Sequence, residues 1–428
     1  MISLLIVFVV LLLINAPIAF VIGLSGLAWF LQDGSFPLSI ATQRVVAQTQ
    51  SITFLAVPFF IFAGNLMNRT GITKNLIKFC RIVTRRMVGG MAQVSVVLST
   101  MMGGVSGSAV ADASMEARIL GPEMLRRGYT KGYTGGVICL TSLITATIPP
   151  SLGLILYGFI GSVSIGKLFA AGIVPGILMM IVLMATVSIT AKKRKFDIPG
   201  PEVKAPTAKE ILTSLKSAFW AILFPVILIV GIRFGFFTPT EAGAFACIYA
   251  IFVGVCVYKE LNFKGFLLAL KDSFIDTGAI LLIIALSGIF SYALTVEQTP
   301  VMLANFLFGI SQNPTILMVI IILFLVISGM FIDSNVNIML LTPIFLPVLR
   351  QMGVDDVHFG VCMMTIVTMG CMTPPVGTAL YTVCDILDCP VESYFKETMP
   401  FYAAVIGLTI VMIFVPQIVM FVPNLIYA

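Results

Sequence analysis

The sequence Gly103-Gly104-Val105-Ser106-Gly107-Ser108-Ala109-Val110-Ala111-Asp112 interrupts an otherwise apolar stretch of the chain. The apolar arms beside it, about 89–102 and 108–122, are each too short to cross a bilayer comfortably. Basic residues gather beyond both arms, at 68–88 and 126–131, and such residues favour the cytoplasmic side of a membrane. Residues 88–125 are therefore predicted to form a re-entrant helical hairpin with a small-residue tip, and two full spans remain the alternative.

The composition places the whole chain in a membrane. Of its 428 residues, 59% are hydrophobic and only 10% are charged, whereas a soluble domain carries about 25% charged residues. Apolar blocks near the length of a bilayer crossing recur along the chain, at 217–236, 238–257, 277–296 and 399–424. Because the backbone must satisfy its own hydrogen bonds in lipid, these blocks are predicted to be helices of an all-α polytopic protein.

The net charge of +6 follows the membrane topology. Most lysines and arginines lie in the stretches 68–88, 126–131, 191–216 and 258–272, which are therefore predicted to be cytoplasmic. The lipid bilayer is the expected partner of such a chain, and nucleic acid is not. Residues 1–14 lack a basic start and a small-residue cleavage site, so they are interpreted as a first span and not as a signal peptide.

Two halves joined by a polar linker at 191–216 are predicted. The first half, 1–190, contains scaffold helices (1–68), an amphipathic arm helix (70–87), the hairpin (88–125), a broken helix (134–160) and a helix (168–190). The second half, 217–428, contains scaffold helices (217–257), an arm and helix (260–310), a second hairpin (315–349), a broken helix (358–385) and a helix (399–424). Five crossings and a hairpin in each half would invert the second half and leave both termini in the periplasm.

Internal matches support an inverted repeat. Residues 61–65 match 289–293, Pro17 matches Pro239, and the pair Pro149-Pro150 matches Pro374-Pro375. Asp112 is paired with Asp333 on the same grounds, at an offset in residue number of 221 (333 − 112). Matches in one order at nearly one offset indicate a duplicated unit, and inverted repeats with broken helices are typical of secondary transporters.

The helix interruptions are the candidate sites. Proline removes a backbone donor and frees a carbonyl one turn earlier, and carbonyl and hydroxyl oxygens are hard ligands for a small cation. One cation site per half is predicted, from Gly103, Ser106, Gly107, Ser108, Asp112, Thr145, Thr147 and Pro149 in the first half and Ser328, Gly329, Asp333, Met372, Thr373, Gly377 and Thr378 in the second. The alternatives are that Gly and Pro only help helices pack and bend, and that the two aspartates cap helices.

An anion is predicted to bind between the two cation sites. The N-terminus of each half-helix presents N–H donors and the positive end of a helix dipole. The predicted substrate-binding residues are Ser106, Ser108, Pro150, Ser151, Ser334, Asn335 and Pro375.

Two motifs that would indicate an enzyme are incomplete. The P-loop-like stretch 161–167 is followed by Leu168 where Ser or Thr is required. Ser106 lies in a G-x-S-G sequence that resembles an intramembrane protease, but the histidine that such a serine needs is present only as His358, in an acidic segment. We therefore expect no catalytic residues and no cofactor other than coupling ions.

The tip sequence, the two hairpins and the paired Pro-Pro-Ser and Thr-Pro-Pro-Val-Gly breaks resemble the large membrane subunit of tripartite ATP-independent periplasmic (TRAP) transporters, along nearly the whole chain. The resemblance implies sodium coupling, an elevator mechanism and a bacterial inner-membrane location. It also implies two partners, a small four-helix membrane subunit and a periplasmic substrate-binding protein, and an organic acid such as sialic acid or a C4-dicarboxylate as substrate. A stand-alone sodium/carboxylate symporter of the same superfamily is the alternative.

Overall fold

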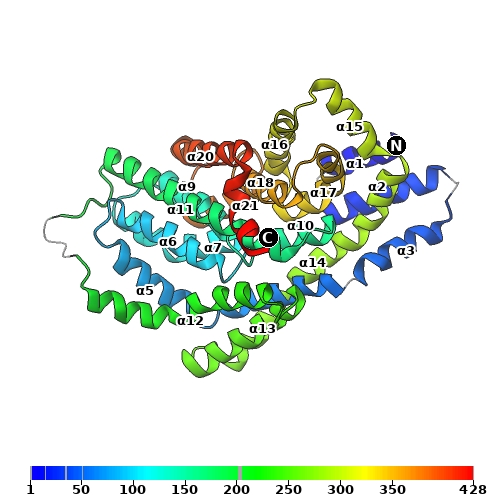
Figure 1. Ribbon diagram of the computed structural model, residues 1–428. Helices are drawn as coiled ribbons and strands as arrows, with labels where there is room; N and C mark the ends of the chain where they lie inside the picture. The colour runs from blue at the N-terminus through cyan, green and yellow to red at the C-terminus, as the bar shows by residue number, and fades with distance from the viewer. Residues whose placement is uncertain (1, 15, 34–35, 51, 201–204, 428) are drawn as a thin grey trace.

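The structure is a computed structural model that describes residues 2–14, 16–33, 36–50, 52–200 and 205–427. In these ranges the regular structure is entirely helical (Figure 1). The first half consists of α1 (Ile2–Leu13), α2 (Ile18–Asp33), α3 (Leu38–Thr49), η1 (Ile52–Leu55), α4 (Ala56–Met67), α5 (Ile72–Thr84), α6 (Gly90–Gly103), α7 (Ala109–Ile119), α8 (Gly121–Arg126), α9 (Lys131–Thr147), α10 (Leu152–Gly161) and α11 (Ile165–Arg194).

The second half is also entirely helical in the described ranges. It consists of α12 (Ala208–Arg233), α13 (Pro239–Phe252), η2 (Val253–Val257), α14 (Phe263–Val296), α15 (Thr299–Ile310), α16 (Pro314–Phe331), α17 (Ser334–Gln351), α18 (Asp356–Gly370), α19 (Thr378–Leu387), α20 (Val391–Phe414) and α21 (Pro416–Tyr427). The segment predicted as an arm and a helix, 260–310, forms the 34-residue helix α14 followed by the short helix α15.

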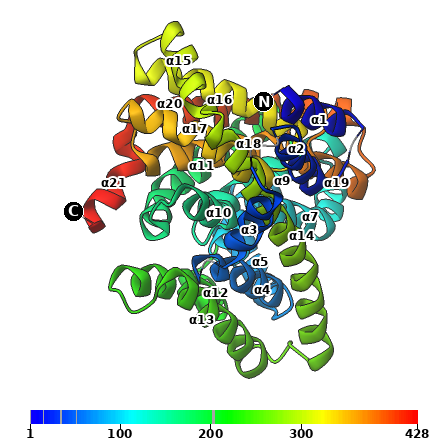
Figure 2. The same cartoon turned by 90° about the vertical axis from the view of Figure 1, so that its right-hand side faces the viewer.

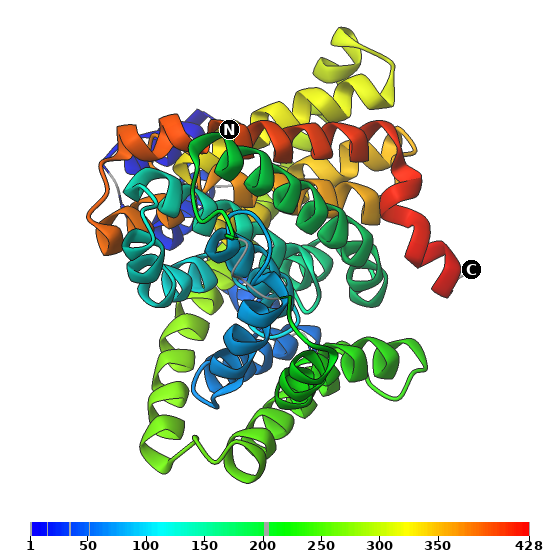
Figure 3. The ribbon, with the colours of Figure 1, turned by 90° about the vertical axis from the view of Figure 1, so that its left-hand side faces the viewer.

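The helices pack into two groups. One group, the scaffold, is formed by α1–α4 and α12–α14, in which α14 packs against α2, α3 and α4, and α13 packs against α4. The other, the core, contains the two helix pairs α6–α7 and α16–α17, the broken helices, α11 and α20. Figures 2 and 3 show α12 and α13 at one end of the molecule and α15 and α16 at the opposite end. Helix α5 packs against both α12 and α6, so it joins the two groups.

The two halves interlock inside the core. The pair α6–α7 packs against α9 of its own half and, through α7, against α19 of the other half. The pair α16–α17 packs against α18 of its own half and, through α17, against α10 of the other. Each hairpin therefore contacts the broken helices of both halves.

The two hairpins differ in length. The arms α6 and α7 have 14 and 11 residues, and a bilayer crossing needs about 20. The arms α16 and α17 have 18 residues each, and α16 is one of six helices in the described ranges that are long and apolar enough to span a membrane. Helices α9 and α10 would make a further span, bent by 46° at the Pro149-Pro150 break.

The helix caps correct the predicted pairing of the two aspartates. Helix α7 begins after its N-cap Ser108, and α17 begins after its N-cap Asp333, at an offset in residue number of 225 (333 − 108). The same offset separates the N-caps of α9 and α18, Thr130 and Asp355, and it separates the two proline pairs. Asp112, which lies one turn inside α7, therefore corresponds to Asn337 and not to Asp333.

Candidate functional site

The first hairpin tip is held against the first helix break by backbone contacts. Gly107 adopts a φ of +63°, which favours glycine, and a β-carbon added there would lie 2.3 Å from the carbonyl oxygen of Pro150. The Leu152 N–H donates to the carbonyl oxygen of Gly107 at 3.3 Å. A nearby backbone contact joins the second hairpin to the second break, because the Val376 N–H donates to the carbonyl oxygen of Met330, in the last turn of α16, at 3.2 Å.

The break and the hairpin also meet through side chains. The Thr145 hydroxyl, fully buried on α9, lies 2.6 Å from Asp112 Oδ2 and 2.9 Å from the carbonyl oxygen of Ser99. The second carboxylate oxygen of Asp112 and the hydroxyl of Ser106 are buried and have no hydrogen-bond partner in the described part of the chain. Because Pro149 and Pro150 have no N–H, they cannot donate to the carbonyl groups of Thr145 and Ala146. We call this group of residues around the first hairpin tip and the first helix break the first half-site. It offers several oxygens to a cation.

A second carboxylate, Glu116, lies one turn beyond Asp112 on α7 and was not among the predicted site residues. Glu116 is fully buried; it accepts a hydrogen bond from the Ser99 hydroxyl at 2.8 Å and another from the Ser95 hydroxyl. Ser95 in turn lies 2.8 Å from the Thr141 hydroxyl. Arg118 is exposed and forms no ion pair with either carboxylate in the described ranges. The spacing of Asp112 and Glu116 on one face of a membrane-embedded arm is the sequence signal that could have found it.

The second half-site has hydroxyl and amide groups where the first has carboxylates. The Ser328 hydroxyl donates to Asn337 Oδ1 at 2.8 Å, and the buried amide nitrogen of Asn337 has no partner among the described residues. Asp333 accepts a hydrogen bond from the Asn335 N–H at 2.9 Å, as the N-cap of α17. Gly329 packs so closely on α18 that a β-carbon would lie 2.7 Å from the carbonyl oxygen of Val367.

Other predicted cation ligands lie around these centres with their side chains or carbonyls engaged. The Thr147 and Thr373 hydroxyls each donate to a carbonyl one turn earlier in the chain. The carbonyl oxygen of Met372 accepts hydrogen bonds from the hydroxyls of Tyr394 and Tyr402, which use both of its lone pairs. Gly377 and Thr378 begin α19, and the Thr378 side chain is exposed.

A cavity of about 380 Å³ lies between the core and the scaffold. Four of the predicted substrate-binding residues line it: Ser106, Ser108, Pro150 and Asn335. Three do not. Ser151 is the buried N-cap of α10, Ser334 is buried at the start of α17, and Pro375 is exposed.

The scaffold wall of this cavity was not predicted. It includes Asn65 and Asn68 at the end of α4 and Asp276 on α14. The Asn65 amide donates to Asp276 Oδ2 at 3.2 Å and to the Ser273 hydroxyl at 3.0 Å. Gly64 allows the scaffold wall to lie close to the first hairpin tip, because a β-carbon there would lie 3.3 Å from the carbonyl oxygen of Ser106. The sequence signal that could have indicated this wall is the presence of polar residues inside apolar helices.

Two interlocked halves, paired helix breaks and a cavity between core and scaffold define a multi-pass membrane transporter. The sequence model of one family, described as "Tripartite ATP-independent periplasmic transporter, DctM component", matches residues 5–418. The chain therefore belongs to this family, the large permease subunits of TRAP transporters, as its resemblance predicted.

Curated relatives extend over nearly the whole chain. It is 35% identical to the sialic acid TRAP transporter large permease protein SiaM of Vibrio cholerae, over 97% of this chain and 96% of that protein. It is 30% identical to the C4-dicarboxylate TRAP transporter large permease protein DctM of Pseudomonas aeruginosa, over 94% of this chain and 93% of that protein. The relatives are named as permeases, which agrees with the prediction that the chain is not an enzyme.

A solved structure shares the fold. The YdaH transporter of Alcanivorax borkumensis, a structure with an unusual topology, superposes with a TM-score of 0.64 and covers 87% of each chain at 11% sequence identity. The all-helical fold is therefore shared with a transporter of very different sequence.

Proposed function

We propose that the chain is the translocating subunit of a sodium-coupled symporter that imports an organic acid of the sialic acid or dicarboxylate class. The observation that carries the proposal is the charge of the 380 Å³ cavity. Its lining residues include the carboxylate of Asp276 but no lysine or arginine. An organic anion in this cavity needs positive charge from elsewhere, and bound cations would supply it. Substrate binding would then depend on the ions, which is the basis of symport.

The two half-sites are the proposed positions of the ions. In the first, the free oxygen of Asp112 and the Ser106 hydroxyl are buried oxygens that a cation would satisfy. Sodium is a hard cation that prefers such oxygens, so the residues fit it. In the second, the amide of Asn337, flipped so that its nitrogen and oxygen exchange places, would donate to Ser328 and present its oxygen. Ser106 lines the substrate cavity as well, so an ion there would lie beside the anion.

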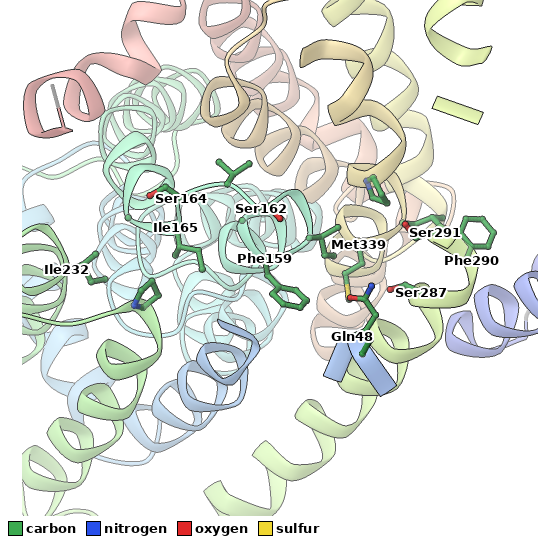
Figure 4. Close-up of a pocket in the computed structure, with 18 of the residues that line it drawn as sticks. Gln48, Phe159, Ser162, Ser164, Ile165, Ile232, Ser287, Phe290, Ser291 and Met339 are labelled. Atoms are coloured by element: carbon green, nitrogen blue, oxygen red, sulfur yellow. The ribbon is translucent and has the colours of Figure 1, made fainter. Parts of the chain in front are cut away.

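A second cavity supports movement of the core along the scaffold. It has a volume of about 820 Å³ and is lined by Gln48, Ser287 and Ser291 on the scaffold side and by Ser162 and Ser164 on the core side (Figure 4). On α14, the offset in residue number from Asp276 to Ser287 is 11 (287 − 276), which corresponds to a rise of about 16 Å. The scaffold thus presents two polar levels, and an elevator movement would carry Ser106 and Asn335 from one level to the other.

The family description supports the proposed partners. A tripartite transporter has two further components, which we propose are a small four-helix membrane subunit and a periplasmic binding protein that delivers the substrate. We further propose that the chain lies in the bacterial inner membrane with both termini in the periplasm, as the basic stretches indicate.

Reconstitution tests this proposal. The full chain is incorporated into proteoliposomes with and without its two partners, and uptake of sialic acid and of succinate is measured under an inward sodium gradient and under a matched potassium gradient. We expect uptake with sodium only, and only when the partners are present. Equal uptake in potassium would refute sodium coupling. Uptake by this chain alone would favour the stand-alone symporter, whose sites would be the same.

A further inference from the structure

A third cavity lies away from the substrate site, where α5 meets the ends of α4 and α7 and the loop before α14. Its volume is about 520 Å³. Four basic residues of one continuous stretch line it, together with one carboxylate and one exposed apolar side chain from the first hairpin: Arg69, Lys74, Lys78, Arg81, Glu260 and Ile119. A concentration of cations around a cavity this size is the arrangement that binds a phosphate group.

The ion pairs around this cavity are weak enough to exchange. Arg69 lies 2.6 Å from Asp272, and Lys74 lies 3.0 Å from Glu260, with every one of these four side chains at least 36% exposed. Arg81 lies 2.6 Å from Glu123. Exposed ion pairs of this kind contribute little to stability, so their cations remain available to another anion. Lys78 is exposed and has no ion pair within the described ranges.

The location of the cavity at the expected membrane interface favours a lipid over a soluble anion as its ligand. Helix α5 buries Ile72, Leu76, Ile77 and Cys80 on one face and carries its cations on the other, the pattern of a helix that lies in the membrane interface. The basic stretch predicts that this interface is the cytoplasmic one. Ile119, which is 44% exposed at the end of α7, adds an apolar surface beside the cations.

We propose that this cavity binds the phosphate of an anionic phospholipid of the inner leaflet. The cations of α5 hold the headgroup, and an acyl chain lies along Ile119. Because α5 packs against α12 of the scaffold and α6 of the core, and the cavity is lined by α5 and α7 together, the lipid contacts the connection between the two groups. This inference stands independently of sodium coupling and of the transported acid.

Native mass spectrometry of the full chain in detergent tests the proposal. The protein is titrated with phosphatidylglycerol and, separately, with phosphatidylcholine of the same acyl chains; inorganic phosphate is then added as a competitor. The variants are Lys78→Gln and the double variant Lys74→Gln/Lys78→Gln. Lys193→Gln is the matched control, because Lys193 is also exposed and predicted to be cytoplasmic but lies outside the cavity.

We expect phosphatidylglycerol to bind in preference to phosphatidylcholine. Each lost cation should weaken that binding about fivefold, the loss expected for one lysine near an anionic membrane surface. Lys193→Gln should leave it unchanged. An equal loss in Lys193→Gln would show diffuse attraction and overturn the proposal. Complete displacement of the lipid by millimolar phosphate would overturn it in favour of a free-anion site. Equal affinity of the unmodified protein for both lipids would overturn it without any variant.

Discussion

The two half-sites share a backbone frame but differ in the number of their carboxylates. At the offset of 225 that relates the two halves, Asp112 of the first half-site corresponds to Asn337 (337 − 112), and Glu116 corresponds to Leu341 (341 − 116). Both carboxylates of the first half-site are buried, and neither has a basic partner in the described ranges. The difference shows that the two halves share the helix breaks, while the first half-site has two carboxylates inside α7 and the second has only the N-cap carboxylate of Asp333.

This difference has an energetic consequence for the proposed cation sites. A cation in the first half-site would meet two carboxylates, whereas one in the second would meet the single carboxylate of Asp333, which already accepts from the Asn335 N–H, beside hydroxyl and amide dipoles. Charge–charge attraction at low dielectric is stronger than charge–dipole attraction. The first half-site should therefore bind its ion more tightly.

The largest expected effect is a difference in sodium-driven uptake between variants of Asp112 and of Asp333. Asp112→Asn removes one carboxylate charge of the first half-site and should lower sodium-driven uptake by about 100-fold, the upper end for the loss of a group that tunes a metal site. Asp333→Asn should keep uptake close to the unmodified level, because Asn caps a helix as well as Asp does. Uptake in reconstituted proteoliposomes, normalised to inserted protein, measures both. An equal loss in the two variants would contradict the corrected pairing.

The next effect concerns stability at the second pair of matched positions. Glu116→Ala removes the acceptor of the buried Ser95 and Ser99 hydroxyls; Ser95 keeps Thr141 as a partner, so the expected cost is about 1–3 kcal/mol for the one unsatisfied group, Ser99. Leu341→Ala should cost about 2–5 kcal/mol by leaving a cavity. Glu116→Gln should recover most of the loss, since Gln keeps an acceptor. Thermal unfolding in detergent measures these values. If Glu116→Ala unfolds like the unmodified protein, the network does not support the hairpin.

A smaller effect tests whether the second half-site can be made to resemble the first. Asn337→Asp places a carboxylate at the position that corresponds to Asp112. It should lower the sodium concentration for half-maximal uptake about tenfold, which equals about 1.4 kcal/mol of added attraction. The sodium dependence of uptake checks this, with Asn313→Asp, at the distant N-cap of α16, as the matched control. A sodium requirement that stays the same or rises would place the ion elsewhere.

The smallest effect is expected at the exposed contact between the halves. Lys131 donates to the Asp388 carboxylate at 2.7 Å and holds the pKa of Asp388 below its ordinary value. A lowered carboxylate pKa stabilises the folded state above the ordinary pKa, and this contribution is lost as the pH falls through the folded-state pKa. Because the Asp388 side chain is 97% exposed, Asp388→Asn should leave the melting temperature at pH 7 almost unchanged. A drop of more than about 4 °C would show a structural role that exposed pairs lack.

Sequence patterns were sufficient to predict the helix interruptions and the hairpin tips of the site, because local chemistry determines these features. Adjacent prolines interrupt a helix wherever they stand, and the Gly-Ser tip is too polar for a continuous span. Ser106, Ser108, Pro150 and Asn335 line the cavity, and their binding of substrate stays a prediction. The pairing of Asp112 with Asp333 was wrong because the two residues were matched by their identity alone. Their positions relative to the helix starts differ, and those positions are known only when the helix caps are known.

The residues that were missed depend on packing between distant helices. Glu116 is satisfied by Ser95 and Ser99 of the neighbouring arm, and its burial follows from the way α6, α7 and α9 pack. Asn65 and Asp276 lie 211 residues apart and are joined only by the packing of α4 on α14. No spacing in the sequence brings these residues together.

The carboxylates of α7 also make the core sensitive to the membrane potential. Asp112 and Glu116 belong to the group of helices that is proposed to move, and they are charged whenever no cation or proton neutralises them. Moving one elementary charge through the membrane potential is worth about 2.3 kcal/mol per 100 mV. In a cell whose interior is negative, the potential would drive the empty core outward whenever these carboxylates are ionised. The membrane voltage would then reset the transporter after each delivery, and bound cations would remove that force for the inward step.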